Sequence, residues 1–415
     1  MTTFDALGVS PHLVACLAAG GITAPLPIQA ATIPDALAGR DICGRAETGS
    51  GKTLAFGVPL VERTVRADRG GPRGLVLVPT RELAGQVRDV LAPLAAAGGL
   101  RIAAVFGGTP MDRQIKVLLR GADIVVATPG RLIDLAERGV VSLASVRTLV
   151  LDEADRMVDM GFMPQVEWLL RRVTGEHQTL LFSATLGAEV DRLVRHYANR
   201  PVHHSVVSDQ PTVESMEHRL VKVHEMDKVK VAAAVAQAAS RALLFVRTKR
   251  GADRTVRRLR MEGVTAGVLH GGLTQSARQR ALAQFRDGRV SLLVATDVAA
   301  RGLDVDGVDV VIHYDPPEDH KAYLHRSGRT ARAGEGGVAV SLVLWDQVVE
   351  AERLCLRLGI RQPLVEMFSN DPRLADLTSQ AWPANTELAT GTEGAPRPAR
   401  TSARRPRSGR GRRRP

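Results

Sequence analysis

One stretch of the sequence has the residue types and spacing that bind a nucleoside triphosphate. Residues 46–53, Ala46-Glu47-Thr48-Gly49-Ser50-Gly51-Lys52-Thr53, fit a phosphate-binding loop with Ala46 in place of the first glycine. The two glycines let backbone N–H groups turn onto phosphate oxygens, and the helix expected after them offers its positive N-terminus. Lys52 is predicted to neutralise the β- and γ-phosphates, and Thr53 to ligate Mg²⁺. The plain alternative is a glycine-rich turn that only starts a helix.

A second cluster favours the nucleotide interpretation. Asp152-Glu153-Ala154-Asp155 directly follows an apolar run, Thr148-Leu149-Val150-Leu151. A carboxylate at that point can hold Mg²⁺, and its neighbour can orient or deprotonate the attacking water, so we assign Asp152 and Glu153 to these roles. Taken alone, four such residues are more often an acidic turn on the surface. Together with the phosphate loop they predict a P-loop ATPase.

The elements that must position these residues are short apolar runs alternating with helical patterns. Such alternation predicts a mostly parallel sheet with helices on both faces. The pattern occurs twice, and 415 residues are too many for one ordinary core. We therefore expect two α/β domains, residues 1–204 and 218–368, joined by a polar linker at 205–217. Strands are expected at 74–78, 124–127, 149–151, 180–182, 242–246, 266–269, 292–295, 310–312 and 338–340, and helices at 81–91 and 113–119.

The C-terminal end of the chain differs from the rest in composition. Residues 369–415 lose the hydrophobic periodicity, and we predict a disordered, low-complexity, arginine-rich tail. Nine arginines and no acidic residue lie in 397–415, so removing this segment lowers the formal net charge from +12 to +3. Clustered arginines gain affinity by releasing counterions from phosphates. The tail is expected to bind a polyanion, which composition alone leaves open between RNA, DNA and an anionic membrane; a merely solubilising extension is the alternative.

Several classes of protein are disfavoured by composition. No apolar stretch is long enough for a transmembrane helix, and the first residues lack the pattern of a secretory signal. The three cysteines, Cys16, Cys43 and Cys355, are too far apart for a paired zinc or disulfide pattern. We expect a cytoplasmic protein with no membrane association.

The motifs, taken in order, resemble the DEAD-box family of ATP-dependent RNA helicases, of the superfamily 2 group and of bacterial type. The resemblance runs from about Phe4 to about Leu344 and implies two tandem RecA-like domains that use ATP and Mg²⁺. Its motifs in this chain are Pro25–Gln29, residues 46–53, Pro79–Ala84, Thr128–Arg131, Asp152–Asp155, Ser183–Thr185, His270–Gly272 with Gln275 and Arg278, Ala295–Asp297, Ala300–Asp304 and His325–Arg332.

The resemblance also implies roles at the ATP site. Gln29 pairs with the adenine edge, Phe4 lies over the base and Asp304 binds the ribose. Arg329 and Arg332 are identified as arginine fingers, which stabilise charge on the transferred phosphoryl group. The coupling residues are Asp155, Ser183, Ala184, Thr185 and His325. Ile22, Leu26 and Ala331 stand where the family usually has phenylalanine, a hydroxyl residue and glycine.

The RNA contacts that the resemblance implies are to the backbone and the 2′-OH, which distinguish RNA from DNA without reading sequence. Two of them, Thr80 and Thr128, follow prolines, so a helix cap is the alternative role for each. The implied residues are Thr80, Arg81, Gly107, Gly108, Thr128 and Arg131 in the first domain and Gln275, Arg278 and Thr296 in the second.

The function implied is an ATP-dependent RNA helicase that unwinds short duplexes or remodels RNA–protein complexes when its two domains close on single-stranded RNA. An ATP-gated RNA clamp with little unwinding would have nearly the same sequence. A DNA-stimulated enzyme is a further alternative, while a kinase or GTPase would leave the second-domain motifs unexplained. The sequence leaves open the target RNA, the protein partners and the oligomeric state, and it is compatible with a monomer.

Overall fold

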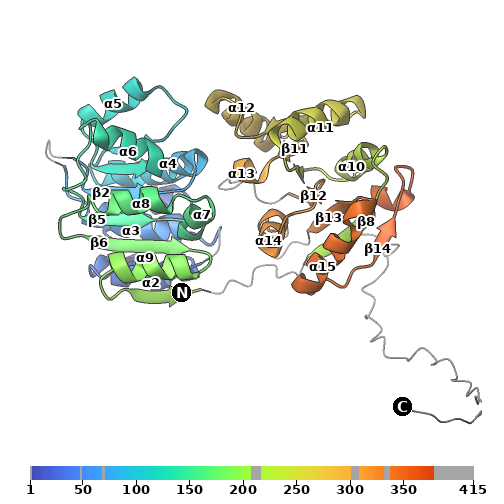
Figure 1. The fold of residues 1–415 in the computed structure, drawn as a ribbon. Coiled ribbons are helices and arrows are strands. Elements are labelled where there is room, and N and C mark those ends of the chain that lie inside the picture. The colour runs from blue at the N-terminus through green and yellow to red at the C-terminus, as the bar shows by residue number, and fades with distance from the viewer. Residues whose placement is uncertain are drawn as a thin grey trace, which may run out of the picture.

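The computed structural model describes residues 2–46, 49–67, 71–206, 216–300, 308–330 and 337–377, and these form two α/β domains (Figure 1). Figure 1 shows the first domain in blue and green and the second in yellow to red. The first contains the 3₁₀ helix η1 (Asp5–Leu7) and the helices α1 (Pro11–Ala19), α2 (Pro27–Leu37), α3 (Lys52–Arg63), α4 (Arg81–Ala97), α5 (Met111–Leu119), α6 (Pro129–Glu137), α7 (Ala154–Asp159), α8 (Met163–Leu170) and α9 (Ala188–Tyr197).

The sheet of the first domain has seven strands in the order β3-β4-β2-β5-β6-β1-β7, with every neighbouring pair parallel. Parallel strands are buried on both faces and are continuously apolar, which is how β2, β4 and β5 appear in the sequence. The strands are β1 (Ile42–Arg45), β2 (Gly74–Leu77), β3 (Ile102–Val105), β4 (Ile124–Ala127), β5 (Thr148–Leu151), β6 (Gln178–Ser183) and β7 (Val202–Ser205).

The second domain repeats this architecture. Its seven strands have the order β10-β11-β9-β12-β13-β8-β14, again with parallel neighbours. Its elements are β8 (Glu217–Lys222), α10 (Lys228–Gln237), β9 (Ala242–Phe245), α11 (Lys249–Met261), β10 (Ala266–Leu269), α12 (Gln275–Arg286), β11 (Leu292–Ala295), α13 (Asp297–Ala300), β12 (Val310–His313), α14 (His320–Ser327), β13 (Val338–Val343), η3 (Trp345–Gln347), α15 (Val348–Leu358), β14 (Leu364–Glu366) and η4 (Pro372–Ala375).

Each sheet separates two hydrophobic cores. Alternate residues of one strand enter opposite cores, so Val76 packs with α3 and α4 whereas Leu75 and Leu77 pack with α6, α8 and α9. The second sheet divides in the same way, with Leu244 facing α10 and α11 and Leu243 facing α12. The predicted fold class, two tandem domains with helices on both faces of a parallel sheet, is confirmed.

Three predicted boundaries are corrected by the structure. The second domain does not end at Phe368, because Leu374 and Leu377 are buried in its core. These two apolar residues sit in a polar segment, so hydrophobic periodicity could not find them. The predicted linker at 205–217 is also too long, since β7 includes Ser205 and β8 begins at Glu217. The predicted tail beyond Leu377 lies outside the described residues.

The two domains touch through a buried ion pair. Arg278 near the start of α12 donates from Nε to Glu82 Oε1 in α4 at 2.7 Å, and both side chains are less than a tenth exposed. Gln275 approaches the same oxygen at 3.4 Å. A buried pair of this kind is costly to break from one side, because the partner is left as an isolated charge. The contact therefore fixes α4 of the first domain against α12 of the second.

Candidate active site and RNA interface

The predicted phosphate loop starts at the carboxyl end of β1 and leads into α3. The N–H of Ala46 donates to the Ser183 carbonyl oxygen at 3.0 Å, which ties the loop to β6. Lys52 is the first residue of α3, and its buried Nζ donates to the Ala46 carbonyl oxygen at 2.9 Å. Gly51 immediately before it has φ +87°, a conformation that a residue with a Cβ adopts only under strain. The loop is thereby closed around its lysine, with Gly49, Ser50 and Thr53 beside it.

Gln29 supports this loop from α2. Its side chain is buried, its Nε2 donates to the Gly51 carbonyl oxygen at 3.0 Å, and its Oε1 accepts the Leu26 N–H at 2.9 Å. A primary amide has a second N–H and a second lone pair, so both contacts leave capacity for an adenine edge. The adenine contact itself stays a prediction. Glu47 and Thr48, which were also expected to contact the nucleotide, lie outside the described residues.

Phe4 does not take its predicted place over the base. Its ring is only 2% exposed and packs in the hydrophobic core with Val9 and Leu13. In a chain with so few aromatic residues, burying this ring gains more than exposing it. The apolar side chains that are exposed near Gln29 are instead Ile22 and Leu26.

The two acidic residues after β5 have different surroundings. Asp152 is buried and accepts the Glu153 N–H at 2.9 Å. Burial raises the pKa of its carboxyl to about 7, although the nearby Lys52 ammonium opposes the shift. Glu153 has φ 54°, in the left-handed region that side chains rarely adopt, and its carboxylate forms an ion pair with Arg156 at 2.9 Å. Backbone strain of this kind is often kept at functional sites.

These residues fit a magnesium site of the type that serves nucleotides. Mg²⁺ in such sites keeps several waters and is held by one or two protein oxygens plus the phosphates of the substrate. Asp152 supplies a carboxylate near Lys52, and Thr53, the next residue in the chain after Lys52, supplies a hydroxyl. Among the described residues no cluster of three or more acidic, histidine or cysteine side chains forms a dedicated metal cage. The donor set therefore suits a metal that arrives with a nucleotide.

A hydrogen-bond network joins the acidic cluster to β6. Asp155 Oδ2 accepts from both the N–H and the hydroxyl of Thr185, at 2.9 and 3.1 Å. Ser183 Oγ accepts the Asp155 N–H at 3.2 Å and donates to the Thr185 carbonyl oxygen at 2.7 Å. Ala184 lies between Ser183 and Thr185 in the chain and is half-buried. These four residues, predicted as coupling residues, are thus brought together in the first domain.

The fifth coupling residue approaches from the second domain. His325 on α14 has a lowered pKa, chiefly because it is buried and then because the Arg156 guanidinium is near, with Asp155 and Asp159 opposing. Arg156, His325 and Arg329 line one pocket between the domains. Arg329, a predicted finger, is buried at the end of α14. The other predicted residues of this half, Arg332 and Asp304, lie outside the described residues.

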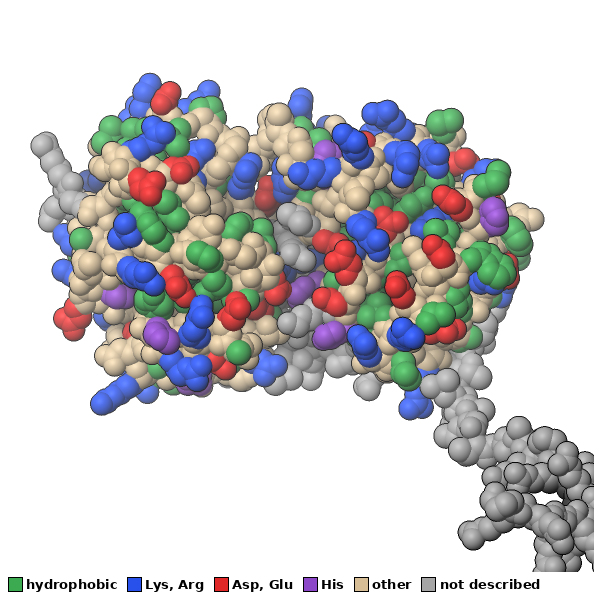
Figure 2. Space-filling view, viewed as in Figure 1, with side chains coloured by type: hydrophobic (Ala, Val, Ile, Leu, Met, Phe, Trp, Pro, Cys, Tyr) green, Lys and Arg blue, Asp and Glu red, His purple; other side chains and the backbone are tan. Residues whose placement is uncertain are grey.

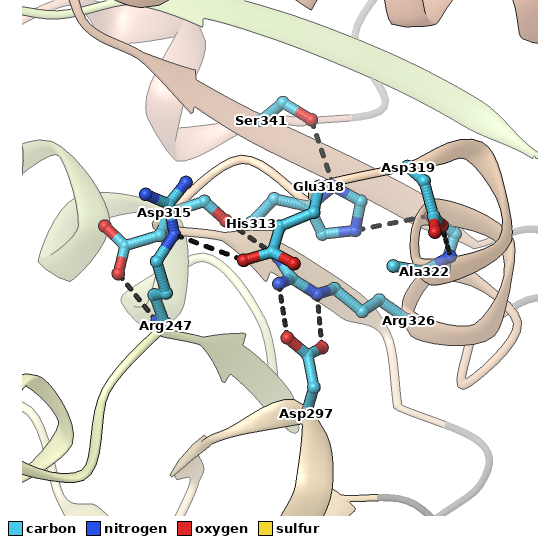
Figure 3. Close-up of polar contacts among 10 residues, drawn as sticks. Arg247, Asp297, His313, Asp315, Glu318, Asp319, Ala322, Arg326 and Ser341 are labelled. Atoms are coloured by element: carbon cyan, nitrogen blue, oxygen red, sulfur yellow. Dashed lines mark hydrogen bonds and ion pairs between the residues drawn. The ribbon is translucent and has the colours of Figure 1, made fainter. Parts of the chain in front are cut away.

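Helix α14 is held by an internal polar network (Figure 3). Arg326 donates twice to the Asp297 carboxylate, at 2.6 and 2.7 Å, and once to the Asp315 carbonyl oxygen at 2.7 Å. On the far side of the helix, His313 shares hydrogen bonds with Ser327 at 3.3 Å and Ser341 at 3.2 Å. Bidentate contacts fix the orientation of a guanidinium as well as its position. The network therefore determines where α14 presents His325 and Arg329.

The RNA residues predicted in the first domain lie on neighbouring loops at the carboxyl ends of β2, β3 and β4. Thr80 caps α4 by accepting the Leu83 N–H at 3.2 Å, as the alternative interpretation expected. Thr128 precedes α6 without a side-chain cap bond. Arg81 is exposed, and its guanidinium covers Gly107 and Gly108 so closely that a Cβ on Gly108 would collide with it.

Arg131 on α6 joins this group by donating to the Thr109 carbonyl oxygen at 3.2 Å.

The RNA residues predicted in the second domain are largely buried. Gln275 and Arg278 face Glu82 across the domain boundary, and Thr296 lies between β11 and α13. The sequence analysis did not predict that Gln275 and Arg278 contact the other domain. The negative charge of Glu82, within the motif Pro79–Ala84, could have indicated a cationic partner.

Comparison with known proteins identifies the family. Residues 26–193 match the DEAD/DEAH box helicase family and residues 222–334 match the helicase conserved C-terminal domain. The chain is 42% identical over 345 residues to the DEAD-box ATP-dependent RNA helicase CshA of Geobacillus kaustophilus, which covers 83% of this chain and 74% of that protein. CshA of Bacillus licheniformis is 42% identical over 82% of this chain and 70% of its own length. The chain belongs to the DEAD-box family of ATP-dependent RNA helicases.

A solved structure of the family has the same two-domain arrangement. Dbp5 of S. cerevisiae bound to RNA and ADP BeF3 matches with a TM-score of 0.75 and 27% identity, over 89% of this chain and 97% of that one. The chain is thus an RNA helicase that depends on ATP, as the sequence motifs implied. The described residues contain no helix long and apolar enough to cross a membrane. The expected cytoplasmic location stays a prediction.

Proposed function

We propose that this helicase assembles its ATPase centre from two halves, so that hydrolysis is fast only when the domains close on RNA. The observation that carries the proposal is the pocket between the domains, where Arg156 of α7 faces His325 and Arg329 of α14. The cationic half thus comes from a different domain than Lys52 and Asp152. Each ligand that favours the closed state then favours binding of the other.

The first-domain half binds and positions the triphosphate. Lys52 lies where it can leave the Ala46 carbonyl oxygen and pair with β- and γ-phosphate oxygens. Thr53 and Asp152 are the groups that hold Mg²⁺, which when bound neutralises charge on the phosphates. The raised pKa of Asp152, about 7, supports this role, because burial makes the bare carboxylate unfavourable until a cation accompanies it.

Glu153 is proposed to orient the attacking water and accept its proton. Its ion pair with Arg156, at 2.9 Å to Oε2, fixes the carboxylate. Arg329 is proposed to stabilise the negative charge that develops on the transferred phosphoryl group, together with Arg332. Both roles need the γ-phosphate to lie between α7 and α14, which the shared pocket allows.

The coupling to RNA is proposed to run through two contacts. On the ATP side, Asp155 and Thr185 connect the acidic cluster to β6, and His325 of the second domain lies against Asp155. On the RNA side, Glu82 joins Arg278 next to Thr80 and Arg81. Both contacts join the two domains, so RNA in the groove and ATP in the cleft would stabilise the same closed arrangement.

The RNA is proposed to bind across both domains through its phosphates and 2′-OH groups. The supporting observation is the row of loops after β2, β3 and β4, where Arg81 and Arg131 lie near Gly108 and Thr109. Backbone recognition without base readout suits an enzyme that acts on many sequences.

The test is the substitution Glu153→Gln. The amide keeps an oxygen for Arg156 but cannot take a proton, so we expect RNA-stimulated kcat to fall at least about 10²-fold while ATP and RNA binding are retained. The measurement is steady-state phosphate release, with binding followed by fluorescence anisotropy. The matched control is Glu137→Gln, at an exposed position at the end of α6. Turnover near the wild-type rate, or loss of binding together with turnover, would refute the assigned role.

A further inference from the structure

We propose that the outer face of α11, formed by Arg250, Arg254, Arg257 and Arg258, is a second RNA-binding surface that holds the strand after it leaves the groove between the domains. We call these four residues the α11 arginine face. The inference extends the proposed RNA path and concerns long or structured RNA, since a strand confined to the groove does not reach the far end of this helix.

The four arginines share one face because of their spacing. The apolar residues Ala252, Val256 and Leu259 are buried against the sheet, so the positions between them point outward. The four arginines are all exposed. Figure 2 shows Lys and Arg side chains gathered on the part of the second domain where Figure 1 labels α11. With Lys249 and Arg260, α11 has six basic residues and one acidic residue, Asp253.

The charges on this face are not neutralised locally. Among the described residues, no carboxylate lies within ion-pair distance, 4.0 Å, of any of the four guanidinium groups. The single acid of the helix, Asp253, is engaged by His270 at 3.1 Å. Like charges three and four residues apart repel, so Arg250, Arg254 and Arg258 weaken the isolated helix. A polyanion bound along the face would relieve that repulsion, and this relief would favour its binding.

The N-terminal end of α11 lies beside the loop after β10, where RNA is expected. Helix α11 starts at the carboxyl end of β9, and Thr248 caps it by accepting the Gly251 N–H at 3.0 Å. The Lys249 side chain lies alongside the loop after β10, within 3.6 and 3.7 Å of where a Cβ would sit on Gly271 and Gly272. That loop leads to Gln275, which reaches the first domain. A strand passing over it meets the first turn of α11.

The chemistry of the face favours a phosphate backbone over a protein partner. Its one large exposed apolar residue is Met261 at the C-terminal end, and no aromatic residue lies in the helix. Stable protein interfaces need an apolar or aromatic centre, whereas a row of guanidinium groups binds phosphates bidentately and releases counterions. The 13 residues of α11 extend about 20 Å, enough for several phosphates.

The test is the triple variant Arg250→Ala, Arg254→Ala and Arg257→Ala in the full chain. We expect the affinity for a single strand of ~40 nucleotides to fall roughly tenfold at low salt, and the slope of log K against log[salt] to decrease by about 2, for three lost phosphate contacts. Stimulation of ATP hydrolysis by an RNA of ~10 nucleotides should stay within about twofold of wild type, because that strand fills only the groove.

The matched control is Arg353→Ala, Arg357→Ala and Arg361→Ala, which removes the same charge from exposed positions on and after α15, on the opposite side of the sheet. An equal loss of long-RNA affinity in the control would reduce the effect to net charge and overturn the proposal. Unchanged binding and salt slope in the α11 variant would also overturn it. Failure of the ten-nucleotide RNA to stimulate the wild type is a different result, since it would contradict the proposed function.

Discussion

The first and second domains repeat one strand order, and a buried lysine begins the equivalent helix in each. Lys52 starts α3 after β1, and Lys228 starts α10 after β8. Each lysine lies near an aspartate that follows the equivalent central strand. Asp152 follows β5, and the charge of Lys52 lowers the pKa of its carboxyl against the larger effect of burial. Asp315 follows β12 and lies 3.9 Å from Lys228. By residue type and topology the two sites are near copies.

They differ in the loop before the lysine. The first domain has glycines with positive φ, Gly49 and Gly51, which free backbone N–H groups for phosphates. The segment before Lys228, Val223–Asp227, contains no glycine, and the Asp227 carboxylate accepts from the N–H and hydroxyl of Ser369 at 2.6 and 2.8 Å. Burial lowers the pKa of Lys228, and the nearby carboxylates of Asp315, Asp346 and Glu225 oppose that shift. Because Lys228 lacks a glycine-rich loop and has three carboxylates around it, we expect phosphate to bind at Lys52 and not at Lys228.

The largest effect that the comparison predicts concerns Arg329, the cation that we propose the second domain contributes to the ATPase centre. Arg329→Ala should lower RNA-stimulated kcat by about 10³-fold or more, because the transition-state charge loses its partner, while ATP binding to the first domain is kept. Phosphate release and nucleotide titration measure the two quantities. Arg357→Ala, an exposed arginine of α15, is the control. If Arg329→Ala retained most of its activity, the second domain would not complete the site.

The next effect separates the two lysines directly. Lys52→Ala should reduce kcat/KM for ATP by about 10²–10³-fold, since it removes a charge placed on the phosphates. Lys228→Met should leave kcat/KM within a few-fold, because methionine fills the buried space and Asp315 is partly exposed to water. Steady-state kinetics on both variants, with thermal unfolding as a check on folding, decide the matter. Comparable losses from both would mean that the second site takes part in turnover.

The smallest effect is on stability and concerns His313 at the end of β12. The equivalent residue at the end of β5 in the first domain is Leu151, which has no titratable group. Burial, and then the charges of Arg326 and His218, hold the pKa of His313 well below its ordinary value. The unfolded chain takes up a proton near pH 6.5 while the folded domain resists it. The stabilisation of the fold by neutral His313 is therefore present above about pH 6.5. It is lost as the pH falls towards the pKa of His313 in the folded domain.

Replacing the histidine should remove that dependence. His313→Asn keeps a hydrogen-bonding side chain without a titratable ring, so its free energy of unfolding should fall less steeply between about pH 6.5 and 5, by up to about 1.4 kcal/mol per pH unit. Urea unfolding at several pH values measures the slope. His320→Asn, at an exposed position at the start of α14, is the control. A slope identical to that of wild type would show that His313 does not contribute to the pH dependence.

The fold class and most elements of the site followed from local sequence signals. Continuous apolar runs predicted the central strands β2, β4, β5, β9, β11 and β12 within two residues of their bounds. Strands such as β3, β7 and β14 were not predicted, because burial alternates along β3 and β7 and is only partial in β14. The predicted end of the second domain at Phe368 is wrong because the two buried leucines beyond it, in a polar segment, form no periodic pattern.

What the sequence by itself determined is the family and the grouping of its motifs into two domains. The spacing of Gly49, Gly51 and Lys52 predicts a phosphate loop, because the backbone conformation that such a loop needs is largely local. Only the tertiary structure decided which groups meet. The burial of Phe4, the pairing of Glu82 with Arg278 and the approach of His325 to Asp155 join residues far apart in sequence. Such contacts depend on how whole sheets and helices pack, and no local pattern encodes them.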